Sequence, residues 1–449
     1  MSVQQQTVVA IFDIGKTNKK FFLIDEQYHI VYEIAQQFDE VTDEDGDACE
    51  DITALTNWVL DTFKETLKLE AYNIKAINFS TYGASFVYVD KDGKPLTPLY
   101  NYLKKYPEQL TEKLYVNYGG VDAFSKETAS PALGSLNSGL QLYRLQQMQP
   151  DIFSKTAFAL HLPQYVSYLL TQKAVSDITS IGCHTALWNF NSNNYHSWVN
   201  ESGIDTKLAP ITAADEVETV SYNNATIKVG TGLHDSSAAL IPYLCNFSDA
   251  FILISTGTWC ISLNPFNDEP LTADELHADC LCYMSFQNKP VKASRLFAGQ
   301  EHENVSKKLA AHFNTANDFY KNVVFDYTLG KRAMGEYAEG KRFNDVDLSS
   351  FTTYADAYHF FLYDLVQQQK VSTTLILGNK KTTRVFVDGG FSRNTIFMNF
   401  LAWAFPDKEV YAASVSQATA IGAALAIHPH WSNKQIAGDM VEMKLFHAV

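Results

Sequence analysis

The chain carries one pattern twice, and this repetition constrains its fold more than any other feature. An apolar run over residues 7–13 is followed by a Gly-containing turn and a second apolar run over residues 21–24. Residues 251–263 repeat this order around the small polar turn Thr256-Gly257-Thr258. Apolar, β-branched runs joined by such turns predict paired strands. We therefore expect a duplicated chain with two domains, each opening with a hairpin.

The length of the chain agrees with this division, because 449 residues exceed what one hydrophobic core usually supports. Further strand-like runs alternate with one-faced helical patterns in both halves, which predicts an α/β fold. Residues 191–224 are polar and loop-like, and this change of composition separates the halves. We predict an N-terminal domain over residues 1–228 and a C-terminal domain over residues 229–449.

Composition excludes several classes of partner. The formal net charge of −15 argues against nucleic acid, because binding of a phosphate backbone needs concentrated Lys and Arg. The six cysteines are dispersed without a CxxC pair, which is typical of a reducing compartment. The sequence shows neither a signal-peptide pattern nor an apolar run of membrane-spanning length. We expect a cytoplasmic protein that binds no membrane and acts as a monomer or a homodimer.

Residues 229–240 join a strand-like run, a glycine-rich turn and Asp235, which lies where a small-residue helix begins. A helix start carries unpaired N–H groups and a partial positive charge, so it keeps a carboxylate ionised. An ionised Asp suits a general base. The alternative is an N-cap, since Asp is a favoured cap, and the stretch taken alone favours it. Evidence of a ligand site elsewhere in the chain would favour the general-base interpretation of Asp235 over the N-cap.

Three turns have the composition of such a site. The turn over residues 13–18 offers backbone N–H groups and the Thr17 hydroxyl to a phosphate, and Asp13 is placed to hold Mg²⁺ through water. The turn at residues 256–258 is similar. A third turn, Gly389-Gly390, lies between a strand and a helix, where glycines let a nucleotide contact the backbone. The alternatives are an ordinary hairpin turn with solvated lysines and a structural glycine pair.

Other segments have plainer interpretations. The acidic residues 39–51 predict an exposed loop, and Asp51 predicts the cap of a one-faced helix. His184 favours a structural role over a ligand contact, because no partner residue lies near it in the sequence. Cys280 and Cys282 favour free buried thiols over half of a metal site, because no second pair follows.

Together these motifs resemble the FGGY carbohydrate kinases, in that family's order along the chain. The resemblance implies a duplicated, two-domain actin-like ATPase fold of the ribonuclease H-like type, with a cleft between the domains. It also implies phosphorylation of a sugar by ATP with Mg²⁺. STYGASFVYVD (80–90) resembles the L-rhamnulokinase members of the family. The motifs that carry the family resemblance are DIGKT (13–17), GLHDSSAAL (232–240), ISTGTW (254–259), VDGGFSRN (387–394) and AIGAA (420–424).

The resemblance also implies roles for individual residues. Asp235 would be the general base, and Asp13 and Asp235 would lie at the metal. The residues implied to contact the sugar are Gly83, His234 and Ser236. Those implied to bind the nucleotide are Gly15, Lys16, Thr17, Thr256, Gly257, Thr258, Gly389, Gly390 and Asn394.

Three departures from the family pattern concern the substrate and the first turn. Residues 98–105 lack the family's Asp and Arg, Ser80 and Ser85 stand where rhamnulokinases carry acidic residues, and Lys16 replaces a small residue. We expect an ATP-dependent kinase of a ketose or deoxyketose that is similar to L-rhamnulose or L-fuculose. The alternatives are a kinase of another polyol or a pentulose such as xylulose, a non-catalytic sugar- and ATP-binding regulator, and a non-sugar ATPase.

Overall fold

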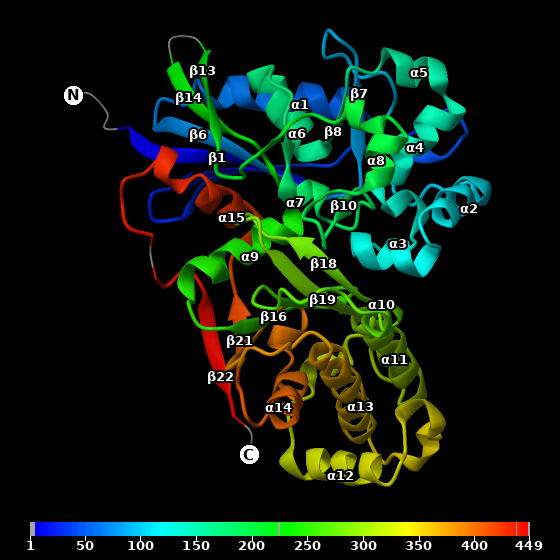
Figure 1. Cartoon of the computed structure of the whole chain (residues 1–449). Coiled ribbons are helices and arrows are strands. Elements are labelled where there is room, and N and C mark those ends of the chain that lie inside the picture. Colours follow the sequence, from blue (N-terminus) through cyan, green and yellow to red (C-terminus); the bar gives the residue numbers. More distant parts are fainter. Residues whose placement is uncertain (1–4, 223–224, 437, 448–449) are drawn as a thin grey trace.

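The structure, a computed structural model, describes residues 5–222, 225–436 and 438–447. Two lobes each contain a seven-stranded sheet (Figure 1). The first sheet has the order β13 (Val217–Tyr222), β14 (Ala225–Gly230), β6 (Tyr72–Thr81), β1 (Gln6–Ile14), β2 (Lys19–Asp25) and β3 (Ile30–Gln36), and β15 (Leu233–His234) also pairs with β6. The second has the order β18 (Cys280–Met284), β19 (Pro290–Leu296), β17 (Cys260–Asn264), β16 (Phe251–Thr256), β20 (Arg384–Gly389), β21 (Glu409–Ser414) and β22 (Glu442–Phe446).

Helices and short two-stranded sheets surround these sheets. In the first half the helices are α1 (Ile52–Thr66), α2 (Glu108–Asn117), α3 (Val121–Thr128), α4 (Ser138–Met148), α5 (Pro150–Lys155), α6 (Leu162–Thr171), α7 (Ile178–Ile181) and α8 (Ser197–Glu201). The short strands are β4 (Glu40–Thr42), β5 (Ala48–Glu50), β7 (Phe86–Val89), β8 (Phe158–His161), β9 (Ser176–Asp177), β10 (Trp188–Asn189), β11 (Asn194–Tyr195) and β12 (Ile211–Thr212). The second half has α9 (Asp235–Asn246), α10 (Ala273–His277), α11 (Ala298–His312), α12 (Tyr327–Ala338), α13 (Tyr354–Thr374), α14 (Thr395–Ala404) and α15 (Ala418–Ala426).

The predicted duplication is confirmed by the pairing of the strands. β1 pairs antiparallel with β2 and parallel with β6, and β6 pairs parallel with β14. In the second sheet β16 pairs antiparallel with β17 and parallel with β20, and β20 pairs parallel with β21. Each lobe therefore opens with a hairpin whose first strand continues into a parallel sheet.

Helices α9 and α15 lie between the two sheets (Figure 1). They share one apolar cluster with residues of both sheets, including Val9 and Ile11 of β1 and Leu253 of β16. The helices approach closely because Gly422 has no side chain: a Cβ there would lie 1.8 Å from the Ala238 carbonyl oxygen. Asn78 Nδ2 of β6 donates to the Ala423 carbonyl at 2.8 Å, which fastens α15 to the first sheet.

The prediction of an exposed loop over residues 39–51 is wrong in part. These residues form the hairpin of β4 and β5, in which Asp43, Cys49 and Glu50 are buried. The cause is a set of contacts with residues 99–104, which are distant in the sequence. The neighbouring prediction is confirmed, because Asp51 caps α1 by accepting from the backbone N–H groups of Thr53 and Ala54. The predicted domain boundary after residue 228 falls within β14, a strand of the first sheet.

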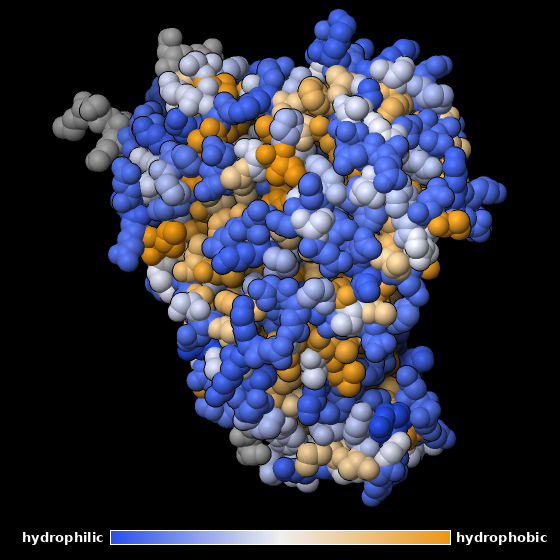
Figure 2. All heavy atoms as spheres, viewed as in Figure 1, coloured by the Kyte–Doolittle hydropathy of each residue, from blue (hydrophilic) through white to orange (hydrophobic). Residues whose placement is uncertain are grey.

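Hydrophilic residues cover most of the face that Figure 2 shows, and the hydrophobic residues between them form separate patches. Within the described ranges, no helix is both long enough and apolar enough to cross a bilayer. The six cysteines, all of which lie in the described part of the chain, are free, and Cys280 and Cys282 are buried as expected.

The contact at Gly422 leads to a prediction about stability. Gly422→Ala forces α9 and α15 apart, so the free energy of unfolding should fall by about 2–3 kcal/mol. The matched control is Gly335→Ala in α12, where nothing lies within 4 Å of an added Cβ. That control should be about 0.5–1 kcal/mol more stable than the wild type, because alanine favours a helix. Urea unfolding followed by circular dichroism measures both, and equal stabilities of the two variants would contradict the prediction.

Candidate active site

Three adjacent strands of the first sheet end at the same edge, and each delivers a predicted site residue there. In the register of β1 and β6, Asp13 lies opposite Ser80, and in that of β15 and β6, His234 lies opposite Thr81. Because these pairings are parallel, the residues that follow the strands gather at one edge. Asp13, Gly83 and Asp235 are therefore brought together from three distant parts of the chain.

Asp235 is the first residue of α9, and the residue that precedes the helix as its N-cap is His234. The N-cap interpretation of Asp235 is therefore wrong by one position, although the Asp does lie at the helix start as predicted. Its Oδ1 accepts from the Ser236 backbone N–H at 2.6 Å and from the Ser236 hydroxyl at 3.3 Å. Asp235 lines a cavity of about 180 Å³ and 35% of its side chain is exposed. Burial of its other sides raises the pKa of Asp235 to about 6, a value suited to a base near neutral pH.

Asp13 is a second perturbed carboxyl group beside Asp235. Burial raises the pKa of Asp13 to about 6, against the effect of a hydrogen bond from Thr419 Oγ1 at 2.7 Å. The negative charge of Asp235 raises it further, and Lys20 lowers it. Asp235 is near enough to Asp13 for its charge to raise the pKa of Asp13, and carboxylate oxygens are ligands that Mg²⁺ prefers. The sequence did not identify Thr419, which lies on α15, as a site residue. It is far from Asp13 along the chain, so no local pattern predicts their contact.

His234 lies directly behind Asp235 and against Gly83. A Cβ on Gly83 would lie 2.7 Å from His234 Cδ2, so only glycine leaves room for the ring. His234 Nε2 is 3.2 Å from Asp235 Oδ1 and 3.4 Å from Cys183 Sγ. Burial lowers the pKa of His234 to about 4, so the imidazole is neutral at pH 7. Among the described residues, its Nδ1 atom has no hydrogen-bond partner.

The two glycine turns of the second sheet are bonded to each other. Thr256 lies opposite Gly389 in the parallel pairing of β16 and β20, and Thr256 Oγ1 donates to the Asp388 carbonyl at 2.6 Å. Gly390 N donates to the Thr256 carbonyl at 3.0 Å. Gly389 has a φ of +90°, and its Cβ would lie 2.0 Å from the Thr256 carbonyl oxygen, so the position requires glycine. The two predicted nucleotide segments thus form one unit.

A larger cavity of about 430 Å³ opens beside this unit. Gly257 and Thr258 line it, and the Thr258 carbonyl accepts from the backbone N–H groups of Gly299 and Gln300 at the start of α11. The sequence did not assign Gly299 and Gln300 to the site. The other lining residues, which it also missed, are His302, Glu303, Ser306, Lys307, Asn317, Asp318 and Tyr320.

Asn394 does not line this cavity. Its side-chain oxygen caps α14 by accepting from Ile396 N and Phe397 N, and its Nδ2 donates to the Tyr358 hydroxyl at 2.8 Å. The same hydroxyl lies 2.7 Å from Nε2 of His302, which does line the cavity. Asn394 therefore contacts the lining of this cavity indirectly, through Tyr358.

Lys16 lies in the first turn, but its ammonium group contacts carboxylates. Lys16 Nζ is 3.3 Å from Glu40 Oε1 and 3.3 Å from Glu50 Oε1. Gly15 N donates to the Asn18 carbonyl at 2.9 Å and closes the turn, and Thr17 at its tip is exposed. The acidic partners of Lys16 were missed in the sequence because they were assigned to an exposed loop.

Comparison with known proteins identifies the family of the chain. Residues 8–241 match the sequence model of the FGGY family of carbohydrate kinases, N-terminal domain, and residues 248–435 match the carbohydrate kinase FGGY, C-terminal domain. Rhamnulokinase of Halalkalibacterium halodurans is 24% identical over 266 residues, which are 55% of this chain and 52% of that protein. The chain thus spans about half the length of the curated relatives that it matches.

Solved structures show the same fold. A carbohydrate kinase from Novosphingobium aromaticivorans superposes with a TM-score of 0.81 at 23% identity, covering 99% of this chain and 95% of the other. A ligand-bound xylulose kinase from Lactobacillus acidophilus superposes with a TM-score of 0.77 at 15% identity, covering 98% and 93%. The predicted two-domain α/β fold of the actin-like type is therefore confirmed.

The raised pKa of Asp235 predicts a pH-dependent effect on stability. Its pKa moves from the usual 3.8 to about 6 on folding, so ionisation opposes folding above pH 6 and this penalty fades as the pH falls toward 4. Asp235→Asn should therefore raise the Tm at pH 8 and raise it less at pH 4.5. The control is Asp61→Asn, whose side chain is 72% exposed on α1 and should leave the Tm unchanged at both pH values. A Tm gain that is larger at pH 4.5 would contradict the prediction.

Proposed function

Because the chain belongs to the FGGY family of carbohydrate kinases, we propose that it transfers the terminal phosphoryl group of ATP to a hydroxyl of a ketose or deoxyketose. The observation that carries this proposal is the convergence of Asp13 and Asp235, which come from the ends of β1 and β15 on either side of β6. The turns that follow β1 and β16 would offer a phosphate backbone N–H groups other than those of Gly15 and Gly257, which donate within the turns. Phosphoryl transfer needs positioning, charge neutralisation and a base, and these groups would supply each of them.

In the proposed reaction Asp235 accepts the proton of the sugar hydroxyl as its oxygen attacks the phosphorus in line with the leaving group. A pKa of about 6 leaves most of the carboxylate ionised at neutral pH and still basic enough to take a proton. The positive end of α9 keeps it ionised. Ser236, His234 and Gly83 would surround the sugar, where the neutral imidazole of His234 offers a hydrogen-bonding atom without a charge.

Mg²⁺ fits the pair of carboxylates, because hard oxygen ligands and uncompensated negative charge are what this ion selects. Asp13 and Asp235 would hold it, with Thr419 fixing the orientation of Asp13. When bound, such an ion neutralises the charge of the phosphates during transfer. The turns at Gly15-Lys16-Thr17 and Thr256-Gly257-Thr258 would bind phosphate oxygens, and Gly389, Gly390 and Asn394 would support the nucleoside.

Tyr82 and Tyr102 pack edge to face at 6.0 Å beside the segment of Gly83, and they give this side of the site an aromatic character. Similarity to rhamnulokinases favours L-rhamnulose or L-fuculose. ADP release measured with L-rhamnulose, L-fuculose, D-xylulose, L-ribulose and glycerol distinguishes these substrates. Equal ATP consumption with and without each sugar would overturn the kinase proposal.

Substitution of the base tests the mechanism. Asp235→Asn should lower sugar-dependent kcat by at least about 100-fold, because a general base contributes about 10²–10⁴ to the rate. Binding of ATP should change much less, and circular dichroism should confirm the fold. Full sugar-dependent turnover in this variant would show that Asp235 is not the base. Ser192→Ala, in a polar surface turn, serves as the control and should retain wild-type kinetics.

The pH profile is a separate prediction. Both carboxyl groups must be ionised for the proposed reaction, and the pKa of each is about 6. The value of kcat/KM for the sugar should therefore fall as the pH drops below 6, by about tenfold to 100-fold per pH unit. Thr419→Val removes a hydrogen bond that lowers the pKa of Asp13, so it should move this limb to higher pH. A profile that is flat from pH 5 to 7 would contradict the assignment.

A further inference from the structure

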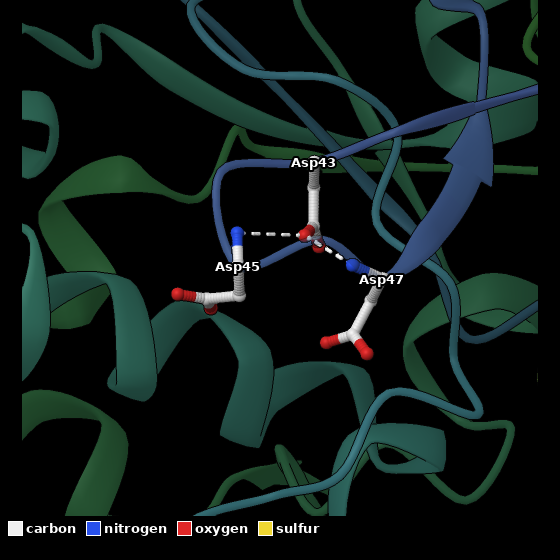
Figure 3. A group of neighbouring side chains, drawn as sticks. All are labelled: Asp43, Asp45 and Asp47. Carbon is white, nitrogen blue, oxygen red and sulfur yellow. Dashed lines mark hydrogen bonds between the residues drawn. The ribbon is translucent and has the colours of Figure 1, made fainter.

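The hairpin of β4 and β5 is built around one buried ammonium group. Asp43, Asp45 and Asp47 turn their carboxylates toward one point, with ligand atoms within 4.8 Å of one another (Figure 3). Lys104 Nζ occupies that point, at 2.5 Å from Asp43 Oδ2, 2.8 Å from Asp45 Oδ2 and 2.9 Å from Asp47 Oδ2. The cluster therefore holds its own cation in the form of a side chain.

Backbone hydrogen bonds and burial hold this cluster of Asp43, Asp45, Asp47 and Lys104 in one arrangement. Asp43 Oδ1 accepts from the backbone N–H groups of Asp45 and Asp47 at 3.0 Å each, the two bonds drawn in Figure 3. Lys104 has only 3% of its side chain exposed and Asp43 has none. Burial lowers the pKa of a lysine, but here the three carboxylates outweigh it and raise the pKa of Lys104 to about 12. The ammonium group stays charged and locks the hairpin loop to residues 99–104.

Two further contacts fasten the hairpin. Arg144 Nη2 of α4 lies 2.8 Å from Asp45 Oδ2. The Glu50 backbone N–H, at the end of β5, donates to the Leu99 carbonyl at 3.2 Å. The position of Glu50 is thus set by the segment that also carries Lys104.

Glu50 also contacts the turn over residues 13–18, which the proposed function assigns to phosphate binding and which is called the first phosphate turn below. Its carboxylate is buried, with 8% of the side chain exposed, between Lys16 Nζ at 3.3 Å and Lys19 Nζ at 3.2 Å. Lys19 Nζ also donates to the Lys16 carbonyl at 2.8 Å, which fixes the backbone of the turn. One carboxylate therefore orients Lys16, in the turn between β1 and β2, and Lys19, the first residue of β2.

We propose that Glu50 and Lys104 are positioning residues for the first phosphate turn: Lys104 locks the acidic hairpin, and the hairpin holds Glu50 against Lys16 and Lys19. This inference rests on the proposed function, in which that turn binds ATP. Neither residue touches the reacting atoms. Displacement of Glu50 would free the side chains of Lys16 and Lys19 and make the turn more mobile. The backbone N–H groups of the turn would all remain.

The test is a double-mutant cycle on the KM for ATP, with the full chain and a sugar substrate. Lys104→Met and Glu50→Gln each remove a charge with little change of shape. Each should raise the KM for ATP about tenfold and leave kcat within about twofold, since a small misplacement of a binding group weakens substrate positioning. The double variant should be no worse than the worse single variant, because both substitutions break one chain of contacts.

Lys105→Met is the matched control, because Lys105 is the exposed neighbour of Lys104 and should keep the wild-type KM. If Lys104→Met does not fold by circular dichroism, Asp45→Asn takes its place, since this partner of Lys104 is 53% exposed. Single variants with an unchanged KM for ATP, or effects that multiply in the double variant, would overturn the inference. A wild type without sugar-dependent ADP release would instead contradict the proposed function.

Discussion

The contact between α9 and α15 is the constraint on which the site depends. The backbones of the two helices are in contact there, because any side chain at position 422 would collide with the Ala238 carbonyl oxygen. The first helix begins with Asp235, and the second carries Thr419, which holds Asp13. The spacing of two helices thus determines the spacing of two carboxylates. The raised pKa of both acids follows from that enclosure, because the same packing that brings them together removes water from them.

The duplicated lobes use one strand plan for two kinds of chemistry. In the first lobe the parallel strand ends deliver acidic side chains, which can accept a proton or hold a cation. In the second they bring Thr256 and the Gly389-Gly390 turn together, where the Thr256 hydroxyl donates to the Asp388 carbonyl. Helices α9 and α15 join the two sets because they share an apolar cluster with both sheets.

Local patterns predicted much of this arrangement. The two hairpins, the cap at Asp51 and the strand before Gly389 could be found in the sequence because each depends on neighbouring residues. The hairpin of residues 40–50 could not, because its stability comes from Lys104, whose charge is distant along the chain. The partners of Lys16 and the contact of Thr419 with Asp13 were missed for the same reason. Burial of a charged residue by a remote partner leaves no periodic signal in the sequence.

The glycine unit at Thr256 and Gly389 has a consequence for how such a protein can diverge. A side chain at Gly389 would collide with the Thr256 carbonyl oxygen, whereas a Cβ at Gly390 would meet nothing within 4 Å. The surroundings of Gly83 are defined instead by rings and hydroxyls, such as those of Tyr82, Tyr102 and Ser85, which point mutations can exchange one at a time. In the proposed function, acceptor preference can therefore drift through single substitutions near Gly83, while Gly389 can be replaced only together with a change at Thr256.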